Sequence, residues 1–167
     1  MRKRARQEAT LDAIEAVYRA RLPEFRRVAA AIVGDRELAL DAVQEGFALA
    51  VRKRASFRGA GPLDAWLWRI VVNAARRQLR SRAATEPQLL ETVGAHGNGL
   101  PDAPGERVRV AISLLPERQR LVLFLRYYAD LEYHAIADVL DISAGTVGAT
   151  LNSAHASLRT MLEEVRQ

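Results

Sequence analysis

The segment from Trp66 to Arg80 contains the side-chain types that bind unpaired bases and phosphate groups. Both tryptophans of the chain, Trp66 and Trp68, lie at its start. An aromatic ring can stack on an exposed base, which is worth about 1–3 kcal/mol per base. An arginine can hold a phosphate by two parallel hydrogen bonds, and an asparagine can read the edge of a base. The polar residues repeat at steps of three and four and therefore share one helical face: Arg69, Asn73, Arg76, Arg77 and Arg80.

A plainer interpretation of the same segment stays open. A tryptophan on an amphipathic helix is usually part of the core, and a run of charged residues is usually a solvated face. Trp68 fits packing as well as it fits base stacking. Asp64 is the only acidic residue nearby, at the start of the helix, so the face stays basic on one side.

The stretch from Tyr133 to Leu162 predicts a helix, a short turn and a longer helix, which is the arrangement of a helix-turn-helix DNA reader. Ser143 ends the turn and is expected to cap the second helix with its hydroxyl. The second helix carries an apolar stripe at steps of four, three, four and four residues: Val147, Leu151, Ala154, Leu158 and Leu162. The opposite face, which in such motifs enters the major groove, holds Thr146, Ala149, Thr150 and Ser153. An ordinary helical hairpin is the alternative.

No arrangement of residues predicts an enzyme. His96, His134 and His155 are scattered, and no two histidines have the spacing of a helical metal site. Gly94, Gly97 and Gly99 are not followed by the Lys-Ser/Thr pair of a phosphate-binding loop. No Ser/His/Asp pattern suggests a nucleophile. We therefore expect no catalytic residue, no metal site and no cofactor.

Composition and charge favour a folded protein with a polyanionic partner. The 167 residues are 49% hydrophobic and 27% charged, with no cysteine. No apolar run approaches the roughly 18–20 residues that cross a bilayer, and no signal peptide is recognisable. We expect a cytoplasmic protein without membrane insertion. The net charge of +5 is concentrated: residues 1–82 hold 18 Lys and Arg against 9 Asp and Glu, whereas residues 83–105 carry −3 and residues 106–167 carry −1.

The periodicity predicts an all-α chain of two small helical domains, residues 1–82 and 106–167. Residues 83–105 between them are dense in Pro and Gly and show no sustained periodicity, so they are expected to form a flexible linker. The first domain is predicted to hold four helices, which would run over about residues 11–18, 23–33, 37–53 and 63–82. Pro23 suits the first turn of the second of these helices, Gly34 its end, and Asp35 the cap of the next.

Short strings in both domains resemble one family in order and spacing. In the first domain they are Asp41-Ala42-Val43-Gln44-Glu45-Gly46-Phe47, Phe57-Arg58-Gly59 and Ala65-Trp66-Leu67-Trp68-Arg69-Ile70 followed by Asn73. In the second they are Leu115-Pro116-Glu117-Arg118-Gln119-Arg120 and Ile136-Ala137, Leu140 and Gly145-Thr146-Val147. The chain thereby resembles the extracytoplasmic-function class of bacterial RNA polymerase sigma factors, sigma-70 family, over roughly residues 10–82 and 106–165.

The resemblance implies a subunit that directs promoter recognition, melting and transcription initiation, with core RNA polymerase and promoter DNA as partners. The β′ coiled coil of the polymerase would be bound by Asp41, Gln44, Glu45 and Phe47. The melted minus-ten element would be held by Phe57, Arg58, Trp66, Arg69, Asn73, Arg76, Arg77 and Arg80. The duplex minus-thirty-five element would be bound by Arg118, Arg120, Arg126, Thr146, Thr150, Asn152 and Ser153. The resemblance also implies a contact with the β flap, and it leaves open whether an anti-sigma factor is a further partner.

The recognition helix departs from the family. Members usually carry basic residues just after Gly-Thr-Val, but no Lys or Arg occurs here between Arg126 and Arg159. We therefore expect weak duplex binding by residues 106–167 alone. Either promoter affinity depends on the first domain and on tethering to the polymerase, or the second domain serves chiefly for protein contacts. A stand-alone helix-turn-helix regulator is the alternative function, although it leaves the Trp66–Arg80 face unexplained.

Overall fold

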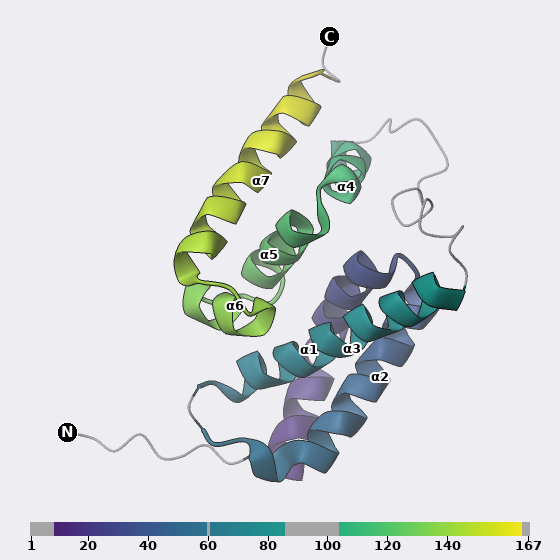
Figure 1. Cartoon of the computed structure of the whole chain (residues 1–167), viewed down its shortest axis with the longest axis vertical. Coiled ribbons are helices and arrows are strands. Elements are labelled where there is room, and N and C mark those ends of the chain that lie inside the picture. Colours follow the sequence, from purple (N-terminus) through teal and green to yellow (C-terminus); the bar gives the residue numbers. More distant parts are fainter. Residues whose placement is uncertain (1–8, 60, 86–103, 165–167) are drawn as a thin grey trace, which may run out of the picture.

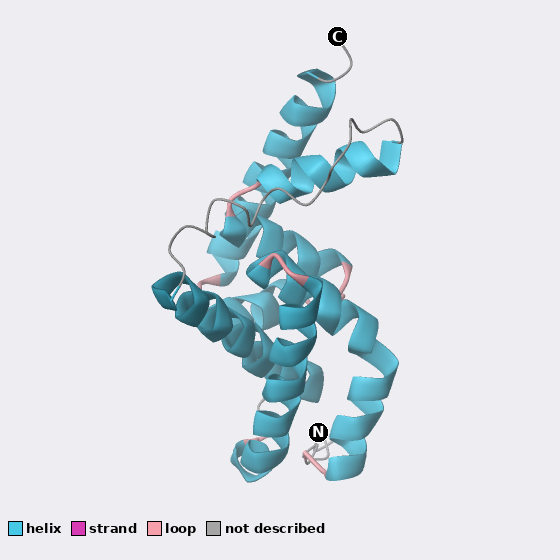
Figure 2. Cartoon of the chain, turned by 90° about the vertical axis from the view of Figure 1, so that its right-hand side faces the viewer, coloured by secondary structure: helices cyan, strands magenta, loops and turns pink. Residues whose placement is uncertain are grey.

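The computed structural model describes residues 9–59, 61–85 and 104–164, and every regular element among them is a helix (Figures 1 and 2). The N-terminal half consists of α1 (Leu11–Val33), α2 (Arg36–Lys53), a 3-10 turn η1 (Arg54–Ser56) and α3 (Leu63–Thr85). The C-terminal half consists of α4 (Pro104–Leu114), α5 (Glu117–Tyr127), α6 (Tyr133–Leu140) and α7 (Ala144–Glu164). The all-α prediction is confirmed over these residues.

Helix boundaries in the N-terminal half follow local rules of capping. Gly34 ends α1 in the left-handed conformation, at φ 73°, which a residue without a Cβ adopts without strain. Asp35 then caps α2, because its carboxylate accepts the backbone N–H groups of Glu37 and Leu38 at 2.8 and 2.9 Å. The predicted roles of both residues are confirmed.

The prediction of two helices before Gly34 is wrong, because α1 runs unbroken from Leu11 to Val33 with Pro23 inside it. A proline in a helix interior removes one backbone hydrogen bond, at a cost of about 3 kcal/mol. Pro23 is exposed, and the apolar stripe continues in phase on both sides of it, from Ile14 to Phe25 and Val28. Burial of this stripe against α2 and α3 therefore holds the helix together across the proline. Within its described residues, the N-terminal half thus has three α-helices rather than four.

The core of the N-terminal half is aromatic. Trp68 of α3 is fully buried and stacks on Phe25 of α1 with the ring centroids 3.8 Å apart. Phe47 of α2 meets Phe25 and Tyr18 edge-on, at 5.0 and 4.9 Å. Such edge-to-face pairs are favoured by the ring quadrupoles, so this cluster fixes the three helices relative to one another.

The C-terminal half contains the predicted helix-turn-helix, formed by α6 and α7. Asp141 ends α6 at φ 57°, a left-handed conformation that aspartate tolerates better than most residues. The Ser143 hydroxyl accepts the Thr146 backbone N–H at 3.0 Å and so caps the start of α7. Val147, Leu151 and Ala154 are buried, whereas Leu158 is only partly buried. The motif and its cap are confirmed.

The two halves lie against each other, as Figure 1 shows for α3 and α6. α1 also contacts α5, and the buried side chains of both halves form one continuous cluster. Most of the predicted linker, residues 86–103, lies outside the described residues. At its edges α3 extends to Thr85 and α4 begins at Pro104. Among the described helices, none is both long enough and apolar enough to cross a membrane.

Candidate nucleic-acid interface

The basic face of α3 is exposed along its length. Leu67, Val71 and Val72 are among the residues that bury the opposite side of the helix. The side chains of Arg69, Asn73, Arg77 and Arg80 all reach solvent, and Arg76 is half-buried. Four arginines and one amide therefore line a single helical face, which can neutralise several phosphates of one strand.

Only one of the two indoles lies at this surface. Trp66 is half-buried and its ring lies 5.4 Å from that of Phe57, tilted by 52°. Phe57 follows η1 directly, and Arg58 beside it is exposed. Gly59 takes a left-handed conformation, at φ 64°, and so turns the chain toward α3. Phe57 and Trp66 form an aromatic pair next to the basic face, whereas Trp68 belongs to the core.

Two of the five polar residues on this face already hold acidic partners. Arg77 pairs with Glu45 of α2 at 3.4 Å, and both side chains are about half exposed. Arg76 donates to Glu117 of α5 at 3.2 Å, which joins the N-terminal half to the C-terminal half. A nucleic-acid strand that used Arg76 would compete with Glu117 for its guanidinium.

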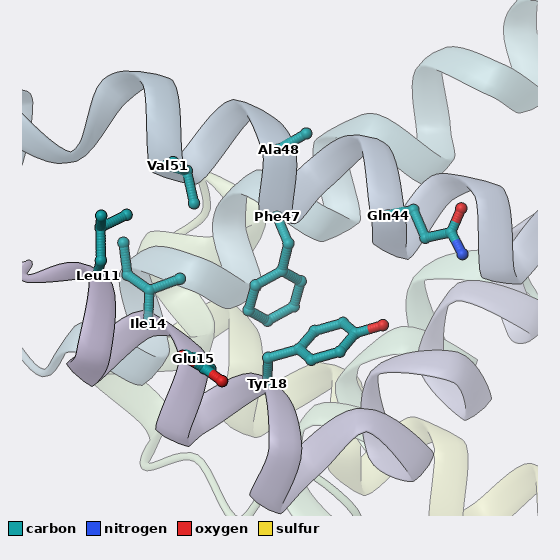
Figure 3. A pocket seen from close by; sticks show the side chains of 8 residues that line it. All are labelled: Leu11, Ile14, Glu15, Tyr18, Gln44, Phe47, Ala48 and Val51. Atoms are coloured by element: carbon teal, nitrogen blue, oxygen red, sulfur yellow. The ribbon is translucent and has the colours of Figure 1, made fainter.

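The polar residues of the acidic face predicted on α2 reach solvent, whereas its aromatic residue is buried. Asp41 and Gln44 are exposed, and Glu45 is half-buried beside Arg77. Phe47 is only 7% exposed, so it contributes mainly by packing behind this face. Its ring also lines an apolar pocket of about 470 Å³ between α1 and α2, whose rim includes Gln44 (Figure 3).

The outer face of α7 consists of small and neutral side chains. Asn152, Ser153 and Ala149 are exposed, and Thr146 and Thr150 are half-buried. The Thr146 hydroxyl lies 2.8 Å from that of Ser143, so it is part of the cap. The Gln119 amide of α5 donates to the Ser153 hydroxyl at 3.1 Å. Asn152 and Ser153 are thus the predicted residues best placed for contact with base edges.

The three arginines predicted to support this face differ in what they bind. Arg118 is exposed. Arg120 donates to the carbonyl oxygens of Ser113 and Leu115 at 2.7 and 3.0 Å, and burial lowers the pKa of its guanidinium while the nearby Glu117 opposes that effect. Arg126 donates to the carbonyl oxygen of Leu131 at 3.1 Å. Arg120 and Arg126 therefore hold the fold of the C-terminal half, and Arg118 is the one of the three that points to a phosphate role.

Two further contacts between the halves involve residues that no sequence pattern singles out. Arg21 of α1 pairs with Asp64 of α3 at 2.9 Å and also donates to the carbonyl oxygen of Ala129 in the C-terminal half. The guanidinium of Arg27 lies 5.2 Å from the ring centroid of Tyr128. These partners are far apart in the chain, so neither helical periodicity nor capping could have predicted them.

Metal-ligating side chains do not gather within the part of the chain that the structure describes, because no three His, Cys, Asp or Glu residues lie close enough to share an ion there. The described surface offers hydrogen bonding, ion pairing and stacking. This chemistry suits the binding of nucleic acid. α3 presents a cationic face beside an aromatic pair, and α7 presents the neutral recognition face of a helix-turn-helix.

Known proteins share both halves of this arrangement. Residues 17–85 match the family description Sigma-70 region 2, and residues 105–158 match Sigma-70, region 4. The chain is 29% identical to the ECF RNA polymerase sigma factor EcfG of Rhodopseudomonas palustris over 150 residues, which are 86% of this chain and 81% of that protein. It is 30% identical to the RNA polymerase sigma-H factor of Pseudomonas aeruginosa over 147 residues, 78% and 76% of the two chains.

A solved structure has the same fold. The sigma factor RpoE of Bartonella quintana, determined in complex with the anti-sigma factor NepR, superposes with a TM-score of 0.73 at 22% identity, covering 92% of this chain and 98% of that one. The two matched regions follow each other in the order that the relatives have, and the helix-turn-helix lies within the second region. The chain belongs to the extracytoplasmic-function family of RNA polymerase sigma factors.

Proposed function

We propose that this alternative sigma factor holds the separated strand of the minus-ten promoter element on the exposed face of α3. The observation that supports the proposal is the one-sided row of Arg69, Asn73, Arg77 and Arg80, with the pair Phe57 and Trp66 at one end. A flipped or unpaired base would stack on the aromatic pair, and the arginines would follow the phosphates. Arg58 and Arg76 would bind further phosphates on either side of this row.

The acidic face of α2 is the proposed contact with the β′ coiled coil of core polymerase. Asp41, Gln44 and Glu45 lie on the surface of a half whose net charge is strongly positive. An acidic patch in such surroundings favours a basic partner, because complementary potentials raise the rate and specificity of docking. Polymerase performs the chemistry, and this subunit supplies sequence choice and strand separation.

The C-terminal half is proposed to bind the duplex minus-thirty-five element through α7 and to contact the β flap. Residues 1–82 and 106–167 would act as separate units on polymerase, with residues 83–105 as their connection. The −3 charge of that connection suits a path among basic walls near the RNA exit channel. The stand-alone regulator is disfavoured, because the match to region 2 accounts for the N-terminal half.

An anti-sigma factor is a proposed further partner. The solved relative is a complex of a sigma factor with the anti-sigma factor NepR. We also propose that this sigma factor is cytoplasmic, because it would meet both core polymerase and such a partner there.

The deciding experiment is run-off transcription with core polymerase on a library of promoters. The double variant Arg69→Ala/Arg80→Ala should lose open complexes while it keeps core polymerase. The slope of log affinity against log salt for a single-stranded minus-ten oligonucleotide should fall by about 0.7 for each lost phosphate contact. The matched control is Arg26→Ala/Arg36→Ala, two exposed arginines on α1 and α2. If the double variant loses polymerase but keeps DNA, the assigned faces are wrong.

A further inference from the structure

We propose that α7 reads A·T pairs in the minus-thirty-five duplex, through an amide, a methyl group and a positioned hydroxyl rather than through cations. The residues are Asn152, Ala149 and Ser153. This inference rests on the proposed function and deepens it, because it names the base pairs that the C-terminal half selects.

The geometry of α7 leaves these three side chains on one accessible face. Val147, Leu151 and Ala154 are 0–2% exposed and bury the opposite side of the helix. Ala149, Asn152 and Ser153 are exposed. In Figure 1, α7 runs along the outer edge of the C-terminal half. Gly145 and Ala156 on the same face are also exposed and small, so the helix can approach the groove floor closely.

Base-edge chemistry then decides what this face can recognise. Guanine presents two acceptors in the major groove and is read best by arginine or lysine, whereas adenine presents an acceptor and a donor that fit an asparagine amide. No Lys or Arg occurs between Arg126 and Arg159. Arg126 itself is committed to the Leu131 carbonyl. Asn152 can therefore pair with adenine, and the Ala149 methyl can pack on the methyl group of thymine.

A contact with Gln119 holds the hydroxyl oxygen of Ser153. The Gln119 amide donates to the Ser153 oxygen at 3.1 Å, so the hydroxyl proton of Ser153 remains free to donate elsewhere. A free hydroxyl donor on this exposed face fits the O4 acceptor of thymine or the N7 acceptor of a purine. The contact links α5 to the recognition face and makes Gln119 a positioning residue.

The test is run-off transcription by full-length protein with core polymerase on a library randomised in the minus-ten and minus-thirty-five windows. Wild-type protein should select A·T pairs at two or more minus-thirty-five positions. Asn152→Ala should lower the preference for adenine at one position by about 5- to 150-fold and leave the minus-ten selection unchanged. Asn152→Arg should shift that same position toward guanine. Thr160→Ala, an exposed substitution farther along α7, is the matched control and should change neither window.

The outcomes separate this inference from the proposed function. One outcome would overturn the A·T inference alone. In it, transcription depends on the minus-ten sequence, but wild-type protein selects G·C pairs or selects nothing in the minus-thirty-five window. The same holds if Asn152→Ala and Asn152→Arg both retain the wild-type selection. An absence of polymerase-dependent transcripts from every template would overturn the proposed function, and the inference with it.

Discussion

Neighbouring residues of the same type have different roles in this protein. Trp66 and Trp68 are two positions apart, yet one lies beside Phe57 at the surface and the other stacks on Phe25 in the core. Residues two apart on a helix point in directions about 200° apart, so they cannot share a face. Spacing alone therefore predicts that one indole is exposed and one is buried. Spacing does not say which of the two indoles is buried, because that depends on where the neighbouring helices lie.

Substitution of the two tryptophans should separate binding from stability. Trp68→Ala should lower the free energy of unfolding by about 3–5 kcal/mol, because it empties a fully packed site. Trp66→Ala should leave stability within about 1 kcal/mol and weaken binding of a single-stranded minus-ten oligonucleotide by about 1–3 kcal/mol. Denaturant unfolding followed by a fluorescence titration measures both quantities. Equal losses of stability in the two variants would contradict the position of Trp66 at the edge of the core, where it is only half-buried.

Local chemistry predicts where most helices of this chain begin and end, and long-range packing decides the exceptions. Gly34, Asp35, Asp141 and Ser143 act as their residue types predict. Pro23 does not end a helix, because the apolar stripe of α1 keeps its phase across it. The expectation that proline ends a helix considers only the local backbone. The burial of the apolar stripe depends instead on packing against α2 and α3, which are distant in the sequence. The all-α fold and the recognition motif were therefore predictable, and the continuous α1 was not.

Replacing Pro23 with alanine should stabilise the protein. The change restores an N–H donor inside α1 and removes the clash of the ring with the preceding turn, an effect of up to about 3 kcal/mol. The greater freedom of alanine in the unfolded chain offsets about 0.4–1 kcal/mol of this gain. Denaturant titration should show a higher midpoint with an unchanged slope. A lower midpoint would mean that the proline serves a local geometry that alanine cannot reproduce.

The crossing of α2 and α3 depends on a residue without a side chain. A Cβ placed on Gly46 would lie 2.9 Å from the Val71 Cγ2 and 3.0 Å from its Cα. The second contact is with backbone, so rotation of the Val71 side chain cannot relieve it. Gly46→Ala should therefore force the helices apart and lower the free energy of unfolding by about 1–3 kcal/mol. Gly148→Ala, whose added Cβ would meet only Tyr133 at 3.5 Å, is the matched control and should be neutral or stabilising.

Across the two halves of the protein, the contact between them uses Arg76, which the proposed minus-ten face also needs. Arg76 belongs to the proposed minus-ten face and binds Glu117, while Arg21 bridges Asp64 and the Ala129 carbonyl. Charge counts along the sequence show a basic N-terminal half and a slightly acidic C-terminal half, which predicts attraction between them. They cannot predict the individual pairs, because those depend on how two folded surfaces meet.

Release of Arg76 should therefore raise affinity for the melted strand. Glu117→Gln removes the carboxylate charge but keeps the size of the side chain, so the halves lose one ion pair without an added clash. Both partners are partly exposed, and pairs of this kind are worth about 0.2–1 kcal/mol, so binding of a single-stranded minus-ten oligonucleotide should tighten by about 1.4- to 5-fold. Glu132→Gln, on an exposed acid 3.6 Å from Arg126, is the matched control and should leave this affinity unchanged.

Because salt screens such pairs, the difference between Glu117→Gln and wild type should shrink as ionic strength rises. If Glu117→Gln binds the strand no better than wild type at low salt, Arg76 does not exchange Glu117 for phosphate, and the contact between the halves places no restraint on strand capture.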